Sequence, residues 1–228
     1  MLGRLKHLVM TVAAPMLGNR WKEYNELGYW RGRRAVEGEL TNDHYKRYYT
    51  QHFGMDDSDY AGKRVLDIGC GPRGSLEWAT MAFRRVGVDP LAKEYLKLGA
   101  DRHQMEYLAA PAEKIPLESR AFDIVCSFNS LDHVENVQAV IHEIKRLTAS
   151  GGVMLLLVEI NHPPTSCEPH SIGPGILHEF EPEFSATRVA VYRPGNEGLY
   201  KALDDGHIVP DPMETRDVGW LSAKLLRR

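Results

Sequence analysis

Cysteine is scarce in this 228-residue sequence, and there is no excess of positive charge. Three cysteines leave little material for a disulfide framework, so a reduced, cytoplasmic setting is expected. The 28 Lys and Arg residues are outnumbered by 31 Asp and Glu residues, which gives a formal net charge of −3. Because no bulk electrostatic attraction to a phosphate backbone is available, this balance argues against a nucleic-acid substrate.

The sequence also has no apolar run long enough to span a bilayer, so no integral membrane segment is expected. Arg4 and Lys6 precede an apolar stretch over residues 8–17, an arrangement that imitates an export signal. Apolar residues nevertheless recur there at helical spacing: Leu2, Leu5, Val9, Val12 and Met16. This stripe favours an amphipathic helix packed on the protein, with contact to a membrane surface and an export signal as the alternatives.

The residues that are present have the composition of a globular domain, with 43% hydrophobic and 26% charged side chains. A chain of this length can bury the core of one α/β domain and still build a small cap. No internal repeat or low-complexity tract divides it. One main domain with one principal site is therefore expected.

A glycine-rich turn follows the first strongly apolar segment, in the stretch VLDIGCGPRG at residues 65–74. The apolar residues before the turn predict a buried strand, and Ser75–Phe83 has the composition of a helix. A strand, a tight glycine turn and a helix form the start of a βαβ nucleotide-binding unit. In such a turn Gly69 and Gly71 can adopt positive φ, and Gly74 would let the new helix pack near the strand.

Two residues in this turn indicate what kind of nucleotide it would bind. The Asp67 carboxylate, two residues before Gly69, would repel a pyrophosphate at the start of the next helix. Pro72 removes one backbone N–H donor, which makes the turn a poorer phosphate cradle. The same carboxylate suits a cationic nucleoside, and S-adenosylmethionine, with its ammonium and sulfonium charges, meets this requirement.

A second acidic residue ends the next apolar segment, Arg85–Asp89, which is predicted to be a short buried strand. Asp89 lies 20 residues after Gly69, the spacing at which an acid meets the ribose hydroxyls in such folds. The alternative is that Asp89, placed before Pro90, caps a helix over Leu91–Gly99. The agreement in spacing between the two motifs favours the ribose contact.

Further apolar segments continue the alternation of strands and helices. Strands are predicted at Met105–Ala109, Ala121–Asn129, Gly151–Glu159, Phe184–Tyr192 and Trp220–Arg227. A helix is predicted over Val134–Thr148, and Pro194–Thr215 is expected to be a long loop. Every residue from Val153 to Val158 is apolar, so the strand at Gly151–Glu159 is expected at the centre of the sheet.

The run Asp67-Ile68-Gly69-Cys70-Gly71, together with the five segments from Val65 to Glu159, resembles the class I S-adenosylmethionine-dependent methyltransferases. The first motif of that family is a hydrophobic strand followed by Asp/Glu-x-Gly-x-Gly. The resemblance implies an α/β, Rossmann-like, doubly wound fold with a seven-stranded, mostly parallel sheet and an antiparallel last strand. It also implies a cofactor-binding domain over residues 63–228 behind an N-terminal helical cap over residues 1–62.

The expected cap is dense in aromatic residues. Within it, Tyr29–Gly32 is the best candidate for a lid over the cofactor, because aromatic faces can cover a sulfonium as they cover other cations. The alternative, favoured for any single aromatic residue, is a helix packed on the sheet edge.

Family resemblance also implies the roles of individual cofactor-binding residues. Gly69, Gly71 and Gly74 would meet the methionine end of the cofactor, and Asp67 would lie near its ammonium. Asp89 would bind the ribose hydroxyls, and Pro90 beside it is also expected to bind the cofactor. Ala112 and Glu113 would flank the adenine, and Ser127 and Asn129 would line the floor of the site. The chain departs from the family at Pro111, which stands where an acid is usual. The adenine amino group would then need another acceptor, either Glu113 or a backbone carbonyl, and the alternative for Glu113 is a solvated loop acid.

Histidines near the ends of two predicted strands are the candidates for acceptor chemistry. His133, His162 and His170 are expected to act as a base or to orient the acceptor, although His133 could be structural and Asp132 could cap the following helix. The proline-rich segment 159–170 is expected to be a polar substrate loop, with a purely structural loop as the alternative. A zinc site at His162, Cys167 and His170 is a third possibility, but their spacing matches no standard pattern, so no metal is expected.

The expected activity is transfer of a methyl group from S-adenosylmethionine to O, N, S or C of a small-molecule acceptor, in a chain that could form a homo-oligomer. An NAD(P)-linked oxidoreductase shares the glycine turn and the ribose acid, but Asp67 and Pro72 argue against it. A non-catalytic protein that binds S-adenosylmethionine is the remaining alternative.

Overall fold

The computed structural model describes residues 19–42, 45–195 and 198–228. The amphipathic helix expected over residues 1–17 lies outside these residues.

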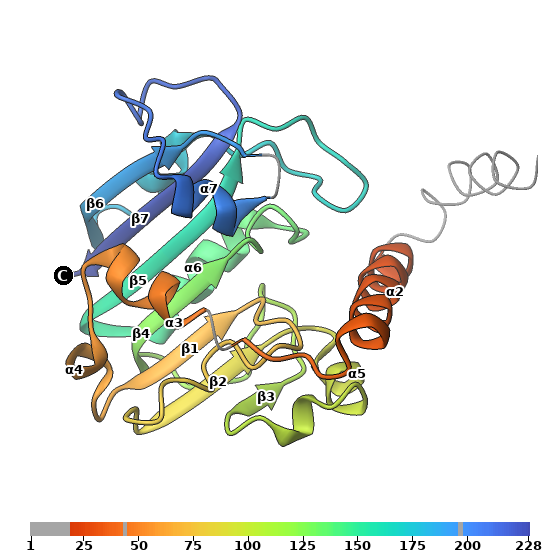
Figure 1. The fold of residues 1–228 in the computed structure, drawn as a ribbon. Helices are drawn as coiled ribbons and strands as arrows, with labels where there is room; N and C mark the ends of the chain where they lie inside the picture. Colours follow the sequence, from red (N-terminus) through yellow and green to blue (C-terminus); the bar gives the residue numbers. More distant parts are fainter. Residues whose placement is uncertain (1–18, 43–44, 196–197) are drawn as a thin grey trace, which may run out of the picture.

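One sheet of seven strands organises the described residues (Figure 1). The strands are β1 (Arg64–Ile68), β2 (Arg84–Val88), β3 (Glu106–Leu108), β4 (Phe122–Phe128), β5 (Thr148–Ile160), β6 (Phe184–Tyr192) and β7 (Gly219–Arg227). Their order is β3-β2-β1-β4-β5-β7-β6, and β7 runs antiparallel to both of its neighbours whereas the other pairs are parallel. This confirms the predicted Rossmann-like, mostly parallel sheet with an antiparallel last strand.

Helices cover both faces of the sheet. The α-helices that the structure describes are α2 (Asn19–Glu37), α3 (Lys46–Tyr49), α4 (Asp57–Tyr60), α5 (Ala92–Lys97), α6 (Val137–Leu147) and α7 (Leu199–Asp205). Three short 3-10 helices are η1 (Gln51–Phe53), η2 (Ala100–Arg102) and η3 (Pro174–Phe180). One face packs against α6 and η3, and the other packs against α3, η1, α4 and α7. The N-terminal helix α2 stands apart from both layers, beside the ends of the central strands (Figure 1).

The two-residue period of the strands divides the core between these faces. In β5, Leu155 and Leu157 join the core under α3 and α7, whereas Leu156 and Val158 join the core under α6. Since all four side chains are fully buried, β5 needs the unbroken apolar run that its sequence shows.

The predicted strands agree with the observed ones to within a few residues, but the helix predicted over Ser75–Phe83 is wrong. That segment is a series of turns, in which hydrogen bonds such as Ala79 N–H to Leu76 O span three residues. Leu76 and Ala79 are buried at this spacing, and the carbonyl of Met81 accepts from Gly62 instead of from a helical neighbour. Tertiary contacts thus hold the chain in turns that composition alone assigns to a helix.

The long loop predicted over Pro194–Thr215 contains the short helix α7. Glycines bound this helix on both sides, with Gly198 at its N-cap and Gly206 in the left-handed conformation at its end. A glycine just past the last turn is a common helix stop. Leu199 and Leu203 of α7 are buried on the sheet, so packing stabilises a helix that the local sequence would not form alone.

The aromatic N-terminal segment contributes to the structure in two ways. Tyr49, Phe53 and Tyr60 are buried in the same core as β1 and β4, which is the packing alternative described above. Tyr29 and Trp30, on α2, instead line the principal cavity.

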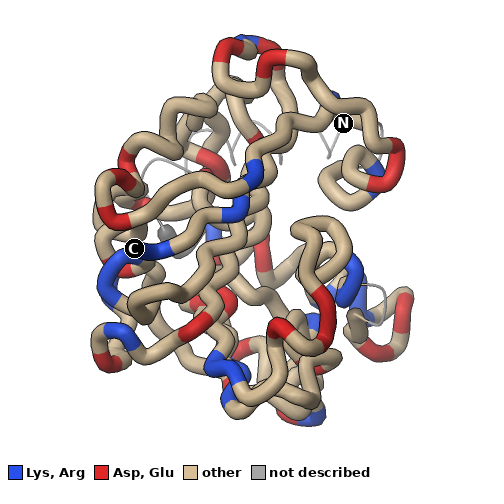
Figure 2. Tube along the Cα trace, turned by 90° about the vertical axis from the view of Figure 1, so that its left-hand side faces the viewer, with Lys and Arg blue, Asp and Glu red and all other residues tan. Residues whose placement is uncertain are grey.

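None of the described helices is both long and apolar enough to cross a membrane. Figure 2 shows basic and acidic positions interspersed along the visible side of the trace.

Helix α6 begins at Val137, three residues later than predicted, and its N-cap is Asn136, whose side chain accepts a hydrogen bond from Ala139 N–H at 3.0 Å. We expect Asn136→Ala to lower the free energy of unfolding by about 1 kcal/mol, because the first turn loses its side-chain acceptor. Urea denaturation measures this change. The exposed Gln138→Ala in the same turn serves as the control, and an equal effect of both substitutions would contradict the cap.

Candidate functional site

A large cavity opens at the carboxyl ends of β1, β2 and β4, where open α/β sheets bind their ligands. Its volume is about 1020 Å³, at the upper end of the roughly 300–1,000 Å³ typical of small-molecule sites. The wall is completed by α2, by residues 110–113 after β3, and by Glu168 from the segment after β5. This space can hold a nucleoside-sized cofactor together with a second small molecule.

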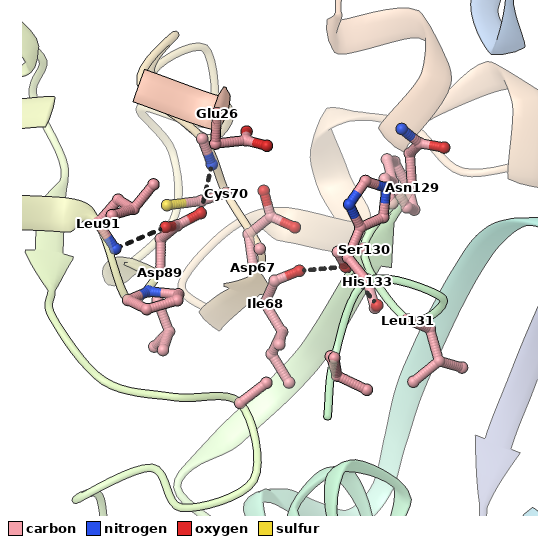
Figure 3. A pocket seen from close by; sticks show the side chains of 18 of the residues that line it. Glu26, Asp67, Ile68, Cys70, Asp89, Leu91, Asn129, Ser130, Leu131 and His133 are labelled. Carbon is pink, nitrogen blue, oxygen red and sulfur yellow. Dashed lines mark hydrogen bonds between the residues drawn. The ribbon is translucent and has the colours of Figure 1, made fainter. Parts of the chain in front are cut away.

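The glycine turn after β1 adopts the conformation that its sequence predicts. Gly69 and Gly71 have φ of +76° and +58°, in the region that side chains disfavour. A Cβ on Gly69 would lie 2.3 Å from Cβ of Ser130, and Ser130 Oγ donates a hydrogen bond to the Ile68 carbonyl at 2.9 Å (Figure 3). The glycine therefore allows the turn after β4 to pack directly against the end of β1.

Gly74 requires a correction. It has positive φ, but it does not line the cavity, and no helix follows it. A Cβ at this position would meet the ring of His103 at 2.8 Å, while its N–H donates to the Tyr107 hydroxyl at 2.9 Å. Gly74 therefore fits the turn against neighbouring side chains and not against a following helix, while its contact with the methionine end of the cofactor stays a prediction.

Asp67 lies on the wall of the cavity at the end of β1, between Asp89 and His133 in Figure 3. The residue is only 2% exposed, and the Tyr49 hydroxyl donates to its Oδ2 at 3.0 Å. Its Oδ1 has no hydrogen-bond partner in the part of the chain that the structure describes. Burial raises the pKa of the Asp67 carboxyl to about 7, against the opposing effect of the nearby Ser75 and Tyr49 hydroxyls.

Asp89 follows β2 and is also buried in the cavity wall. One carboxylate oxygen accepts from Leu91 N–H at 2.9 Å, and the other accepts from Gly71 N–H at 3.3 Å. Asp89 thus connects the glycine turn to the start of α5, and burial raises the pKa of its carboxyl to about 7. Pro90, beside it, lines the cavity as well.

Ala112 and Glu113, predicted to flank an adenine, both line the cavity. Glu113 is not a free, solvated loop acid, because its Oε1 accepts from the N–H groups of Glu135 and Asn136 at 2.8 and 3.2 Å. This carboxylate fixes the loop after β3 to the segment before α6.

The end of β4 places Ser127 and Asn129 on the cavity wall. Ser127 Oγ lies 2.9 Å from Ser130 Oγ, and one of the two hydroxyls donates to the other. Asn129 has a φ of +51°, and its N–H donates to Leu157 O at 2.7 Å. An asparagine tolerates this conformation better than most residues, so it can turn the chain sharply where β4 ends.

Helix α2 lies against the mouth of the cavity and is tied to the glycine turn. The Arg73 guanidinium pairs with Glu37 at 2.8 Å and lies 5.5 Å from the centre of the Trp30 ring, while Trp30 Nε1–H donates to Glu26 at 2.8 Å. The positive charge within the turn is therefore directed to α2. Lys22, also from α2, lines the cavity, and burial lowers the pKa of its ammonium.

Carboxylates outnumber basic side chains on the cavity wall. The acidic residues are Glu23, Glu26, Asp67, Asp89, Glu113, Glu135 and Glu168, and the basic ones are Lys22 and Arg73. Such a wall favours a ligand that carries positive charge over a phosphorylated one.

The three candidate histidines lie in different environments. His133 lines the cavity, and its Nε2 is 3.7 Å from Glu168 Oε1. His162 is only 5% exposed and is not part of the cavity wall, and its Nδ1 is hydrogen-bonded to Pro163 O at 3.0 Å. His170 is also outside the wall, with Nε2 at 2.9 Å from Val134 O, so it anchors its loop. Of the three, His133 is thus the one that lines the cavity, and the catalytic roles of His133, His162 and His170 stay predictions.

Two alternatives that the sequence left open in this region are not observed. Asp132 does not cap α6, because Asn136 does. Among the described residues His162, Cys167 and His170 do not form a ligand group, whereas Asp132, His133 and Glu168 place their donor atoms within 4.8 Å of one another.

Sequence reasoning missed several side chains that shape the site. Tyr49 and Ser130 reach the cavity through tertiary contacts, and no local motif marks either of them. Glu26 lies four residues before Trp30 on α2, a spacing that places both on one helix face. That periodicity could have identified Glu26 once α2 was recognised as a helix.

Two effects of replacing Gly69 on stability can be measured separately: the clash with Ser130 and the strain of a side chain at positive φ. Gly69→Ala and Gly62→Ala both place a side chain at positive φ, +76° and +70°, but a Cβ at Gly62 meets nothing within 4 Å. We expect Gly62→Ala to cost about 1–2 kcal/mol of unfolding free energy from the left-handed backbone alone. Gly69→Ala should cost a further ~1–3 kcal/mol because Ser130 must move. Denaturant unfolding measures both, and equal losses would contradict the close packing.

Comparisons with known proteins agree with this geometry. Residues 66–156 match the family model described as "Methyltransferase domain". A mitochondrial ubiquinone biosynthesis O-methyltransferase of Arabidopsis thaliana is 34% identical over 118 residues, which cover 46% of this chain and 36% of that protein. The matched part of the chain spans about a third to a half of the length of its curated relatives.

Solved structures share the fold at low sequence identity. A methyltransferase of Mesorhizobium loti, described as S-adenosylmethionine-dependent, has a TM-score of 0.57 at 18% identity and covers 74% of this chain and 93% of its own. The [4+2]-cyclase SpnF has a TM-score of 0.62 at 14% identity and covers 92% of this chain and 94% of its own. Residues 66–156 therefore match a methyltransferase domain, and the sheet has the fold of S-adenosylmethionine-dependent methyltransferases of known structure.

Proposed function

We propose that this chain transfers a methyl group from S-adenosylmethionine to a small-molecule acceptor bound in the same cavity. The observation that carries the proposal is the unpartnered Oδ1 of Asp67 beside the glycine turn, within the described residues. A buried carboxylate oxygen without a donor is costly, and a ligand ammonium would supply the missing hydrogen bond.

The remaining cavity residues fit the other parts of such a cofactor. Asp89 keeps acceptor capacity on both oxygens beyond its backbone bonds, which suits ribose hydroxyls. Ala112 supplies an apolar contact for a base, while Glu113 is engaged by backbone N–H groups, which favours a backbone carbonyl as the adenine acceptor. Trp30 lies 3.6 Å from the position of a Cβ on Gly71, where its ring can shield a sulfonium.

When bound, S-adenosylmethionine supplies a methyl carbon that is already activated by its positively charged sulfur. The protein then has little covalent chemistry to perform, and alignment of the acceptor with that carbon can contribute up to ~7–11 kcal/mol. Helix α2 and the turn after β4 both line the cavity and would restrict the orientation of both ligands. His133 is placed to accept a proton from a hydroxyl or amine acceptor.

An oxygen acceptor is favoured over nitrogen, sulfur or carbon by the names of several relatives, which are O-methyltransferases. The cavity volume supports a small molecule in place of a polymer. Four expectations stay predictions: that the substrate is not a nucleic acid, that the protein is cytoplasmic, that it could form a homo-oligomer, and that a cap over residues 1–62 precedes a cofactor-binding domain over residues 63–228. Residues of α2 line the cavity, which supports a role for this helix as a lid over the cofactor.

An NAD(P)-linked oxidoreductase is disfavoured by two observations. Arg73, the basic residue in the glycine turn, is paired with Glu37, so it is not directed at a phosphate. The antiparallel β7 between β5 and β6 also differs from the dinucleotide-binding order, in which the sixth strand follows the fifth directly. The remaining alternative is a non-catalytic or non-methylating protein on the same fold, since the [4+2]-cyclase SpnF shares this architecture.

Isothermal titration calorimetry with S-adenosylmethionine, S-adenosylhomocysteine and NADH tests the proposal directly. We expect saturable heat with the first two ligands and none with NADH, because the acidic wall repels a pyrophosphate. Turnover is then measured as S-adenosylhomocysteine released in the presence of a panel of phenols, carboxylic acids and amines. Tight NADH binding without S-adenosylmethionine binding would overturn the proposal, and binding without turnover would favour the non-catalytic alternative.

The raised pKa of Asp67, about 7, predicts a pH-dependent affinity. Only the ionised carboxylate pairs with an ammonium, so affinity for S-adenosylmethionine should rise by about tenfold between pH 6 and pH 8. Since the folded protein holds this proton more tightly than the unfolded chain, the free energy of unfolding should fall as pH rises from 4 to 7. Asp67→Asn should weaken binding at pH 8 and remove both effects at this position.

Asp89 titrates in the same range, so Asp89→Asn is measured beside Asp67→Asn to separate the two contributions. The exposed Glu118→Gln, outside the cavity, is the control and should leave the pH profile unchanged. An identical profile in wild type and Asp67→Asn would show that Asp67 does not face the cofactor.

A further inference from the structure

A group of unpaired polar atoms lies beside the end of the cavity that His133 lines. Asp132 is 1% exposed, and neither of its carboxylate oxygens has a hydrogen-bond partner among the described residues. The Nε2 atoms of His133 and His162 are also buried and unpartnered in that part of the chain. Four such atoms in one place would be costly unless another group satisfied them.

The distances within the group are too long for hydrogen bonds and suit ligands of one ion. His133 Nε2 lies 4.0 Å from Asp132 Oδ1 and 3.7 Å from Glu168 Oε1. Donor atoms that each lie about 2.0–2.2 Å from a tetrahedral cation are about 3.3–3.6 Å apart, so small side-chain movements would close the site. All three side chains place a donor atom within 4.8 Å of the others.

The orientation of His162 also points to a cation. Its Nδ1 lies 3.0 Å from the Pro163 carbonyl, which can only accept, so Nδ1 must carry the hydrogen. In the neutral ring the Nε2 lone pair then faces Asp132 Oδ2 at 3.5 Å. Two lone pairs that face each other in a buried space repel unless a positive charge lies near them.

The loop after β5 holds Glu168 in place for this role. Thr165 Oγ1 donates to Glu168 Oε2 at 3.0 Å, which leaves Oε1 directed toward His133. His170, two residues later, is hydrogen-bonded to Val134 O at 2.9 Å and fixes the loop against the segment that carries Asp132 and His133. The site is thus assembled from two chain segments that the structure holds together.

We propose that Asp132, His133 and Glu168 bind a divalent transition-metal cation at the acceptor end of the cavity, with His162 beside Asp132 as a positioning residue. One imidazole and two carboxylates are ligands suited to zinc and to other first-row metals. No cofactor or substrate is needed for this binding, so the site can be tested in the isolated chain.

Three protein ligands leave a coordination position open toward the cavity, because His133 and Glu168 line it together with Asp67. A consequence that rests on the proposed methyl transfer is that the acceptor binds the ion through an oxygen. A metal-bound hydroxyl loses its proton more readily. Because His133 Nε2 is then a metal ligand, the proton goes to water instead of to His133, and the acceptor attacks the methyl carbon as an alkoxide or phenoxide. The new oxygen–carbon bond forms as the carbon–sulfur bond breaks, and the sulfur keeps the bonding electron pair.

The test uses the full chain, stripped with a chelator and titrated with zinc chloride by calorimetry, with bound metal counted by mass spectrometry. We expect one equivalent to bind and to raise the melting temperature. Asp132→Asn, His133→Ala and Glu168→Gln should each weaken zinc binding by about 100-fold or more. His178 and Glu181 form an exposed His–Glu pair at 3.4 Å outside the cavity, so His178→Ala and Glu181→Gln are matched controls that should not change binding.

The absence of saturable zinc binding in folded wild type would overturn the proposal, as would unchanged affinity in all three variants. Asp132→Asn also shows whether lost zinc binding reflects unfolding. It removes a buried charge that has no hydrogen bond among the described residues, so the melting temperature of the metal-free protein should not fall. If a protonated His162 satisfies Asp132 instead of a metal, zinc should leave the melting temperature unchanged. Calorimetry with S-adenosylhomocysteine on the zinc-free protein separates the two proposals, since cofactor binding without zinc binding refutes only the metal.

Discussion

The organisation of the site depends on a carboxylate buried at the end of a central strand. Asp67 reaches the cavity from β1, where the Tyr49 hydroxyl donates to one of its oxygens and the other has no hydrogen-bond partner among the described residues. Burial of this group is unfavourable without a partner. The surrounding layers, with α3 on one side and the turn after β4 on the other, hold it there because their apolar residues pack on the sheet.

The cavity combines two chemically different ends. Near the glycine turn, Asp67 and Asp89 present carboxylate oxygens to the cavity, and Trp30 of α2 lies beside Gly71. Toward the loop after β5, His133 and Glu168 present nitrogen and oxygen ligands. Since both ends belong to one cavity, a cofactor and an acceptor can meet without crossing solvent.

Strand positions were predictable because unbroken apolar runs, such as Val153–Val158, demand burial on two faces. The glycine turn was predictable because its positive φ values exclude most side chains. The error at Ser75–Phe83 arose because tertiary contacts override helical composition there. Tyr49 and Asp67 are 18 residues apart in the sequence, and no local sequence pattern predicts the hydrogen bond between them.

The position of β7 carries a consequence for how the sheet is completed. Within the described part of the chain, strand β6 joins the sheet only through β7, which is the later of the two in the sequence. During synthesis, β6 therefore has no partner strand, and the edge of β5 stays unpaired, until residues 219–227 have left the ribosome. A chain that stops before Gly219 would lose two strands from the sheet, so ribosomal stalling near this point would leave an aggregation-prone edge.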